Sequence, residues 1–254
     1  DQSYLPSELI IIDDGSKDNN SKEICNKYKK IIKIKFFKTK NQGPSNARNF
    51  GLKKIKSKYF VFFDPDDVMS KKFIENKIRI FNKEKNPELI GVYSNSILKY
   101  NKINKKLKYK KNISDSNYID TIGYENGISG SLPTYLFRKD ITFNKIFFDN
   151  NLKINEDFDF IIRLLRHKKK VFGTNKFDSI IHLEKSSLTR EKNNRFLVYK
   201  NQIKFLKKAK KLKYFSKNEL RKREKYKEKL MAKNSLINLK IFDLLKYIGK
   251  YLTY

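Results

Sequence analysis

Two apolar runs, each ended at once by an acidic cluster, constrain the fold of this chain more than any other feature. Leu9–Ile12 is followed by Asp13-Asp14-Gly15-Ser16, and Tyr59–Phe63 is followed by Asp64-Pro65-Asp66-Asp67. A short run without polar residues that stops at turn residues is typical of a buried parallel strand. The sequence therefore predicts two buried strands that both end in carboxylates.

The segments around these runs alternate between helical and strand patterns. Ser21–Ile31 predicts a helix, Ile34–Phe37 a strand, and a further helix begins at Pro44, which suits a first helical turn. Ser70 can cap a helix with apolar residues at helical spacing. This order predicts an α/β sheet with helices on both faces. Ligands of such sheets bind beyond the carboxyl ends of the strands, so we expect both acidic clusters to meet at one crevice.

The later part of the chain predicts shorter elements and a helical tail. Leu89–Ile97 predicts a strand, and the Lys-rich stretch up to Lys111 a hairpin or loop. Thr134–Phe137 and Ile146–Phe148 are further short apolar pieces, and Asn155 is expected to cap a helix. From residue 191 the sequence becomes helical and basic, with 20 Lys or Arg and five acids. We therefore expect a catalytic domain over residues 1–190 and a C-terminal extension over residues 191–254.

The charge and cysteine content exclude some classes of protein and leave others open. The chain has 59 Lys plus Arg against 27 Asp plus Glu, a net charge of +32 that attracts polyanions. Only nine of the basic residues are Arg, and the aromatic residues lie mostly in apolar runs, which disfavours a nucleic-acid-binding protein. A codon bias towards Lys, Asn and Ile is an equally simple explanation of the charge. A single cysteine, Cys25, excludes a disulfide framework and a cysteine-cluster zinc site.

The acidic clusters could carry chemistry, although each has a simpler structural explanation. Asp64 and Asp66 are two residues apart, so in an extended segment they point the same way and could share a divalent cation. An acidic strand-to-helix turn is the alternative. Glu156 and Asp157 lie in a first helical turn, where the helix dipole keeps a carboxylate ionised, as a general base requires. Simple helix capping would explain the same residues.

Taken together, the motifs resemble the family 2 glycosyltransferases of the GT-A fold. The resemblance rests on Asp-Asp-Gly-Ser after an aliphatic strand, Asn41-Gln42-Gly43 with Ala47-Arg48-Asn49-Phe50-Gly51, the Asp-Pro-Asp-Asp strand end, and Asn155-Glu156-Asp157. It covers residues 5 to about 190 in order. Pro65 is a departure, since family members more often have Ser there. The resemblance implies a Rossmann-like mixed sheet flanked by helices, followed here by a helical tail.

The resemblance also implies a reaction and a role for each matching residue. The enzyme would be a metal-dependent, inverting hexosyl- or N-acetylhexosaminyltransferase. Its donor would be a nucleotide-diphosphate sugar, with a UDP-sugar as the first expectation, and its product a bacterial surface polysaccharide. Its acceptor would be a hydroxyl of a glycan or of a lipid-linked molecule. A metal-dependent nucleotidyltransferase is the enzymatic alternative, but the sequence has no Gly- and basic-rich triphosphate loop.

The implied site residues fall into three groups. The nucleotide would be bound by Asp13, Asp14, Gly15, Arg48 and Asp64, with Asp14 on the base and Asp13 shaping the turn. A divalent ion, Mn²⁺ or Mg²⁺, would be held by Asp66, Asp64 and His182. Asp157 would take the proton of the acceptor hydroxyl, with Glu156 as its competitor for that role.

The two ends of the chain carry separate expectations. Family members have a strand and turn 30 to 40 residues before Asp-Asp-Gly-Ser, but only twelve residues precede Asp13, so we expect an N-terminal truncation. In the tail, an apolar stripe flanked by Lys240, Lys246 and Lys250 predicts either a helix in an anionic membrane surface or a helix packed on the domain. The first alternative predicts a cytoplasmic enzyme held peripherally on the inner membrane face. The stripe comprises Ile237, Ile241, Leu244, Leu245, Ile248 and Leu252.

Overall fold

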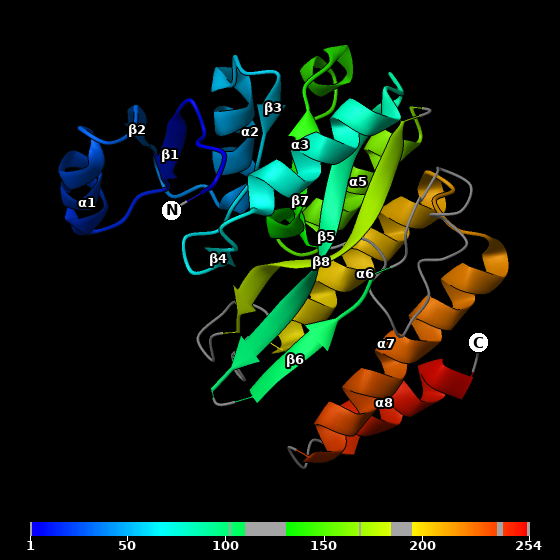
Figure 1. Ribbon diagram of the computed structural model, residues 1–254. Helices are drawn as coiled ribbons and strands as arrows, with labels where there is room; N and C mark the ends of the chain where they lie inside the picture. The colour runs from blue at the N-terminus through cyan, green and yellow to red at the C-terminus, as the bar shows by residue number, and fades with distance from the viewer. Residues whose placement is uncertain are drawn as a thin grey trace. The chain divides into compact units, whose positions relative to one another are not determined.

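The computed structural model divides the chain into two compact units (Figure 1). It describes residues 2–101, 103–109, 131–167, 169–183, 195–237 and 241–252. The first unit reaches Leu183 and contains both acidic clusters, whereas the described helices from Arg195 onward belong to the second unit.

The first acidic cluster ends a small parallel sheet. β1 (Leu9–Asp13) pairs with β2 (Ile34–Lys38) in parallel, and α1 (Asn20–Tyr28) connects them. A parallel pair needs such a crossover, because the chain must return to the starting edge before the second strand begins. The predicted strands and the helix between them are therefore confirmed, although the helix ends three residues early, at Tyr28.

The second sheet is mixed and has six strands in the order β3-β7-β5-β8-β4, with β6 paired to the free part of β5. β5 and β8 run parallel, and all other pairs are antiparallel. The expected Lys-rich hairpin is confirmed by β5 and β6. The strands are β3 (Tyr59–Phe60), β4 (Val68–Met69), β5 (Leu89–Tyr100), β6 (Ile103–Leu107), β7 (Tyr135–Arg138) and β8 (Lys170–His182).

Alternating side chains of this sheet face two different helices, as the pleat of a strand requires. α3 (Phe73–Glu84) lies along β5 in Figure 1, and its Phe81 packs with Val92 and Leu136. On the neighbouring positions, Tyr135 and Phe137 turn the other way. Their rings stack 5.0 Å apart, and Phe137 also contacts Phe160 of α5 (Glu156–Leu165). The predicted α/β sheet with helices on both faces is confirmed.

One predicted strand is shorter than the sequence indicates. Only the first two residues of the predicted strand Tyr59–Phe63 pair in the sheet. The apolar piece Ile146–Phe148 lies in a loop, where the Phe148 ring stacks on Phe160 at 4.1 Å, so its apolar character reflects burial. α2 covers Pro44–Lys54 as expected, and two 3₁₀ turns, η1 (Leu132–Thr134) and η2 (Ile141–Asn144), flank β7.

Over its described residues the second unit is helical, as the sequence predicts. It contains α6 (Arg195–Lys211), α7 (Lys217–Ile237) and α8 (Ile241–Leu252), and α7 and α8 lie side by side in Figure 1. Tyr199 of α6 donates to Glu228 of α7 at 2.8 Å and contacts the Tyr247 ring of α8. None of the helices in the described ranges is both long and apolar enough to cross a membrane.

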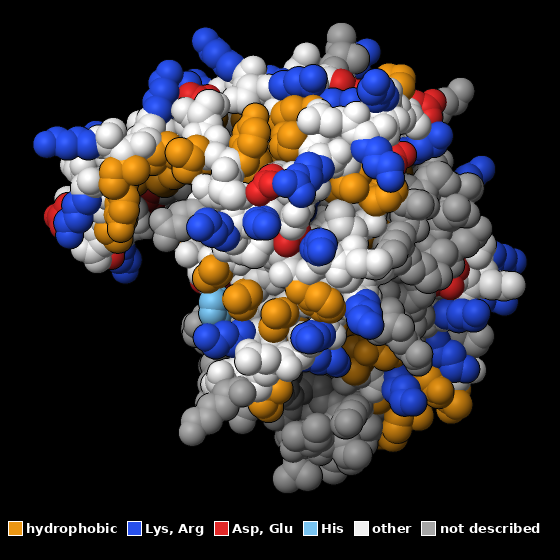
Figure 2. Space-filling view, in the orientation of Figure 1, with side chains coloured by type: hydrophobic (Ala, Val, Ile, Leu, Met, Phe, Trp, Pro, Cys, Tyr) orange, Lys and Arg blue, Asp and Glu red, His pale blue; other side chains and the backbone are white. Residues whose placement is uncertain are grey.

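Part of the predicted apolar stripe of the tail is exposed. Leu245, Ile248 and Leu252 are 62%, 40% and 74% exposed on α8. Lys240, one of the basic residues expected to flank the stripe, lies outside the described residues. Figure 2 shows many Lys and Arg side chains and few acids over the coloured part of the visible face, as the +32 charge implies.

Candidate active site

The first acidic turn is held by Asp13 and Gly15. Asp13 Oδ1 accepts a 2.8 Å hydrogen bond from the Ser16 N–H, and this bond lowers the pKa of the buried Asp13 carboxyl. Gly15 has φ +88°, and a Cβ built on it would lie 2.8 Å from the Asn41 nitrogen. Only glycine fits there without strain, because both the left-handed backbone and the close approach exclude a side chain.

Asp14 is directed at the start of α2. Its Oδ2 accepts from the Gly43 N–H at 2.6 Å, and its Oδ1 accepts from the Thr39 hydroxyl at 2.9 Å. The Gln42 N–H lies 3.2 Å from both oxygens. Gly43 precedes the first residue of α2, so the carboxylate lies where free N–H groups and the helix dipole favour an anion. The structure thus places Asp14 in a role that fixes the Asn41–Gly43 turn.

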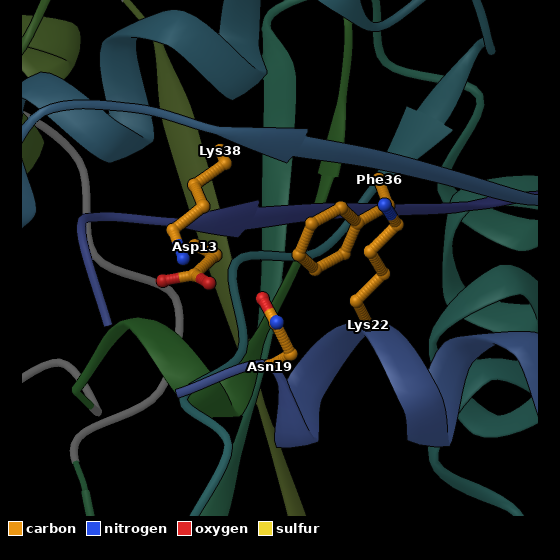
Figure 3. Close-up of a pocket in the computed structure, with 5 residues that line it drawn as sticks. All are labelled: Asp13, Asn19, Lys22, Phe36 and Lys38. Carbon is orange, nitrogen blue, oxygen red and sulfur yellow. The ribbon is translucent and has the colours of Figure 1, made fainter. Parts of the chain in front are cut away.

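A pocket of about 290 Å³ lies beside this turn (Figure 3). Asp13 lines it from the end of β1, and Phe36 and Lys38 line it from β2. Asn19 and Lys22 close it from the α1 side. It combines one aromatic ring with charges of both signs, a lining that suits a flat polar ring carrying an anionic group.

Arg48 of α2 links the second acidic turn to the acidic helix. Its Nη1 lies 2.7 Å from Glu156 Oε1, and its Nη2 lies 3.2 Å from Asp64 Oδ1. Its guanidinium also lies 5.6 Å from the centre of the Phe148 ring. Burial opposes the charged form, but Asp64, Glu156 and Asp157 keep the pKa of Arg48 above its ordinary value. Arg48 is therefore a permanent cation shared by the acids of two motifs.

Glu156 and Asp157 begin α5 in a buried setting. Burial raises the pKa of both carboxyls, and for Glu156 the adjacent Asp157 raises it further, while Arg48 lowers both. Asp157 Oδ1 accepts from the Phe158 N–H at 2.7 Å. Asn155 precedes the helix as expected, but its side chain makes no capping hydrogen bond, because its φ of 63° is outside the usual capping conformation. Asn155 therefore occupies the expected N-cap position without the side-chain hydrogen bond that a capping residue usually makes.

The second acidic turn contacts the end of β8. His182 Nδ1 lies 2.7 Å from the carbonyl oxygen of Asp66, and the His182 N–H donates to Asp67 Oδ1 at 3.0 Å. Burial raises the pKa of Asp67 to about 6, and Asp66 and Asp64 act in the same direction. Since a carbonyl oxygen only accepts, Nδ1 of His182 donates in this contact, which leaves Nε2 directed away from the Asp66 carbonyl group.

The structure brings some of the expected site residues together and keeps others apart. Arg48, Asp64, Glu156 and Asp157, from three separate motifs, form one electrostatic cluster. Asp66 and His182 form a second contact, but within the described ranges no three acidic, His or Cys side chains are close enough together to hold a metal ion. Asp13, Asp14 and Gly15 are connected to the cluster through α2, which Asp14 caps and which carries Arg48.

Three residues of this region were not singled out by the sequence. Asp67 belongs to the acidic tetrapeptide and Phe148 to the apolar piece Ile146–Phe148, so the sequence contained a signal for both, whereas Thr39 carries none. Thr39 becomes relevant because it follows β2, next to the end of β1. Phe148 does so because it packs under Arg48. Both roles depend on contacts between segments far apart in the sequence.

Comparison with known proteins identifies the relatives of this chain. The family model "Glycosyl transferase family 2" matches residues 1–141. An uncharacterized glycosyltransferase of Haemophilus influenzae is 30% identical over 193 residues, which cover 75% of this chain and 73% of the relative. The poly(ribitol-phosphate) beta-N-acetylglucosaminyltransferase TarP of Staphylococcus aureus is 32% identical over 209 residues, 77% of this chain and 61% of TarP.

The fold also matches a solved structure. Residues 1–349 of S. aureus TarS, crystallised with UDP-GlcNAc, superpose with a TM-score of 0.60 at 17% identity, covering 98% of this chain and 82% of that one. Several curated relatives are far longer than this chain, which spans only 17% to 18% of three of them.

Proposed function

Because this chain belongs to glycosyltransferase family 2 and has the GT-A fold, we propose that it moves a sugar from a UDP-sugar to a hydroxyl of a bacterial surface polymer. The observation that carries the proposal is the double ion pair of Arg48 with Asp64 and Glu156. It joins the strand-end acids, where a donor would bind, to the acidic helix, where an acceptor would be activated. TarP is named for N-acetylglucosaminyl transfer and TarS was crystallised with UDP-GlcNAc, so a UDP-N-acetylhexosamine is the first donor to test.

The donor nucleotide is assigned to the end of β1 and the start of α2. Asp13, Asp14 and Gly15 would frame the base and ribose, and the pocket beside Asp13 offers the Phe36 ring to a flat base. Asp64 and Arg48 would lie on the ribose and diphosphate side. A guanidinium suits this position, because it stays charged when buried and binds phosphate oxygens through two donors.

Asp157 is proposed as the general base. A carboxylate that removes the acceptor proton while the oxygen attacks the anomeric carbon produces inversion, since the nucleoside diphosphate leaves from the opposite face. The raised pKa of Asp157 makes it a stronger base than an exposed carboxylate. Glu156 is the weaker candidate because its carboxylate is already bound to Arg48 at 2.7 Å.

The residues around the second acidic turn fit a divalent cation, Mn²⁺ or Mg²⁺. Asp66 and Asp64 offer carboxylate oxygens, and His182 offers Nε2 while its Nδ1–H is bound to a carbonyl oxygen, as is usual for a metal-ligating histidine. Fewer than three protein ligands are gathered among the described residues, so the donor diphosphate would complete the set. The cation would neutralise charge on the departing nucleoside diphosphate.

The basic tail is proposed to hold the enzyme peripherally on the cytoplasmic face of the membrane. Exposed Leu245, Ile248 and Leu252 on α8, in a segment rich in Lys, give the combination of apolar and cationic groups that binds anionic headgroups. This location would suit a lipid-linked acceptor.

Ligand-dependent thermal stability tests the proposed function. UDP with Mn²⁺ should raise the melting temperature, whereas a single-stranded oligonucleotide at equal phosphate concentration should not. Arg48→Ala should abolish the UDP effect, and Lys53→Ala, on the same helix, should retain it. Stabilisation by the oligonucleotide alone would instead favour a nucleic-acid-binding protein and overturn the proposal.

A further inference from the structure

A lysine is buried in the interior of the first unit, away from the site described above. Lys77 of α3 has no exposed surface, and its Nζ lies 3.4 Å from Asp178 Oδ2 on β8 and 3.3 Å from the Ser94 hydroxyl on β5. Burial lowers the pKa of Lys77 to about 7, while Asp178 opposes this shift. A buried ion pair is rarely more stable than apolar residues of equal size, so its presence points to a requirement for specificity.

Asp178 also binds the segment that follows the second acidic turn. Its Oδ1 accepts from the Ser70 hydroxyl and from Asn76 Nδ2, each at 3.1 Å. The Ser70 N–H in turn donates to the Asp178 carbonyl oxygen at 2.8 Å. One buried carboxylate therefore holds both α3 and the residue just after β4.

The segment between Asp64 and Ser70 is attached to β8 at three places. Ser70 is bound to Asp178, Val68 and Met69 pair with Ile180 and Ser179, and His182 contacts Asp66 and Asp67. Because β4 has only two residues, its ladder alone is a weak determinant of register. The contact of Ser70 with Asp178 lies beyond one end of this two-residue ladder, and the contact of His182 with Asp66 lies beyond the other end. Both contacts therefore require the same register of β4 on β8.

We propose that Lys77 and Asp178 are positioning residues that fix the register of β4 on β8. Through this register they hold the side chains of Asp66 and His182 in place relative to each other. The proposal rests on the proposed function, in which Asp66 and His182 face the cation and donor. Apolar contacts tolerate a slip of the strand, but hydrogen bonds to a fixed carboxylate do not. A shift by one residue would turn the side chains of β4 to the opposite face.

Three variants and one control test this role. Asp178→Asn and Lys77→Met remove one charge of the pair, and Ser70→Ala removes a single hydroxyl of a partly exposed residue and is the variant most certain to fold. Ile90→Val, in the buried part of β5, is the control for general loss of packing. Two quantities are measured: amide hydrogen exchange by NMR, and Mn²⁺ binding in the presence of UDP, followed by the electron spin resonance of free Mn²⁺.

The proposal predicts a local effect. The amides of Ser70 and His182 should exchange at least about tenfold faster in the three variants, with the β1 amides unchanged, and half-saturation by Mn²⁺ should rise about tenfold. Ile90→Val should change neither. Unchanged exchange, or an equal increase in β1, would overturn the proposal, as would unchanged Mn²⁺ binding despite faster local exchange. Wild-type protein that fails to bind Mn²⁺ with UDP would refute the proposed function, and the exchange data would still decide the register.

Discussion

Arg48 and Glu156, which are 108 residues apart in sequence, form an ion pair with 2.7 Å between Nη1 and Oε1. Both side chains are largely buried, at 17% and 12% exposure, so the pair is screened little by water. The second guanidinium nitrogen binds Asp64. Two nitrogens of one planar guanidinium thus bind two different carboxylates, which a lysine ammonium could not do in the same geometry.

Arg48→Lys should lower kcat/KM by about 10²-fold, because a lysine keeps the charge but cannot bind Asp64 and Glu156 together in the same plane. The measurement is UDP release from the donor at low substrate concentration. Lys53→Ala on α2, whose ammonium contacts the Phe147 ring rather than the acids, should retain full activity. Equal activity of Arg48→Lys and wild type would show that only the charge matters.

Asp157→Asn should reduce kcat by about 10³-fold, since the amide cannot accept the acceptor proton. Glu156→Gln should cost less, about tenfold, because it weakens the contact with Arg48 without removing the base. KM for the donor should change little in Asp157→Asn. If Glu156→Gln were the more damaging variant, the two roles would have to be exchanged.

The rate should fall at low pH with a midpoint above the ordinary value for an aspartate. Burial raises the pKa of Asp157, so the carboxyl takes up its proton at a higher pH than an exposed one, and the protonated form cannot act as a base. A profile of kcat between pH 4.5 and pH 8 measures this. The residual activity of Asp157→Asn should lack that acid limb; the same limb in the variant would assign it to another group.

Gly15→Ala should destabilise the fold by about 1–3 kcal/mol, because the residue has φ +88° and its Cβ would meet the Asn41 nitrogen at 2.8 Å. Gly249→Ala on α8 is the matched control. Nothing lies within 4 Å of a Cβ there, so helix propensity should stabilise the protein slightly. Urea unfolding followed by circular dichroism compares the two. Equal stabilities would show that the turn can relax.

The stability of the protein should increase between about pH 7 and pH 10, because folded Lys77 has released a proton that the unfolded chain still binds. The folded pKa of Lys77 is lowered to about 7 against 10.5 for the free side chain, so in this window the unfolded chain binds more protons. Stability rises with pH wherever that holds. Melting temperatures at pH 7, 8.5 and 9.5 should show a flatter dependence in Lys77→Met than in wild type. Parallel curves for the two proteins would contradict the lowered pKa of Lys77.

Binding to anionic vesicles should depend on the exposed apolar residues of α8. Replacing Leu245, Ile248 and Leu252 by Ser removes the side chains that would contact the lipid acyl chains but leaves the number of Lys residues unchanged. Flotation with phosphatidylglycerol vesicles should therefore be lost. Phosphatidylcholine vesicles should not bind either protein. Equal flotation of the wild type and of a chain without residues 191–254 would exclude the tail as the anchor.

The sequence predicted those parts of the fold that local pattern determines. β1, β2 and α2 follow from apolar runs and from Pro44, and so does the acidic end of β1, whereas Asp64 lies four residues beyond the end of β3. β8 was not predicted, because its middle carries Thr174, Asn175 and Lys176 and shows no clear alternation. β4 has two residues, too few for any pattern.

The candidate site was predicted in its residues but not in its contacts. The motifs named the acids and Arg48, yet the pairing of Arg48 with Glu156 depends on how α2 and α5 pack, and no local pattern contains that. The Asp14 bonds to Gly43 and Gln42 likewise depend on where the chain returns after β2. The buried pair of Lys77 and Asp178 could not be predicted from the sequence, because a lysine in an amphipathic helix normally faces water.

Turnover of a UDP-sugar is the most direct test of whether this protein is a glycosyltransferase with Asp157 as its base. Purified protein with UDP-GlcNAc and Mn²⁺ should release UDP, at least by slow transfer to water, and Asp157→Asn should reduce that rate about 10³-fold while still binding UDP. A panel of other UDP-sugars identifies the donor if UDP-GlcNAc is not used. Absence of UDP release from every donor, or equal rates for wild type and Asp157→Asn, would contradict a glycosyltransferase whose base is Asp157.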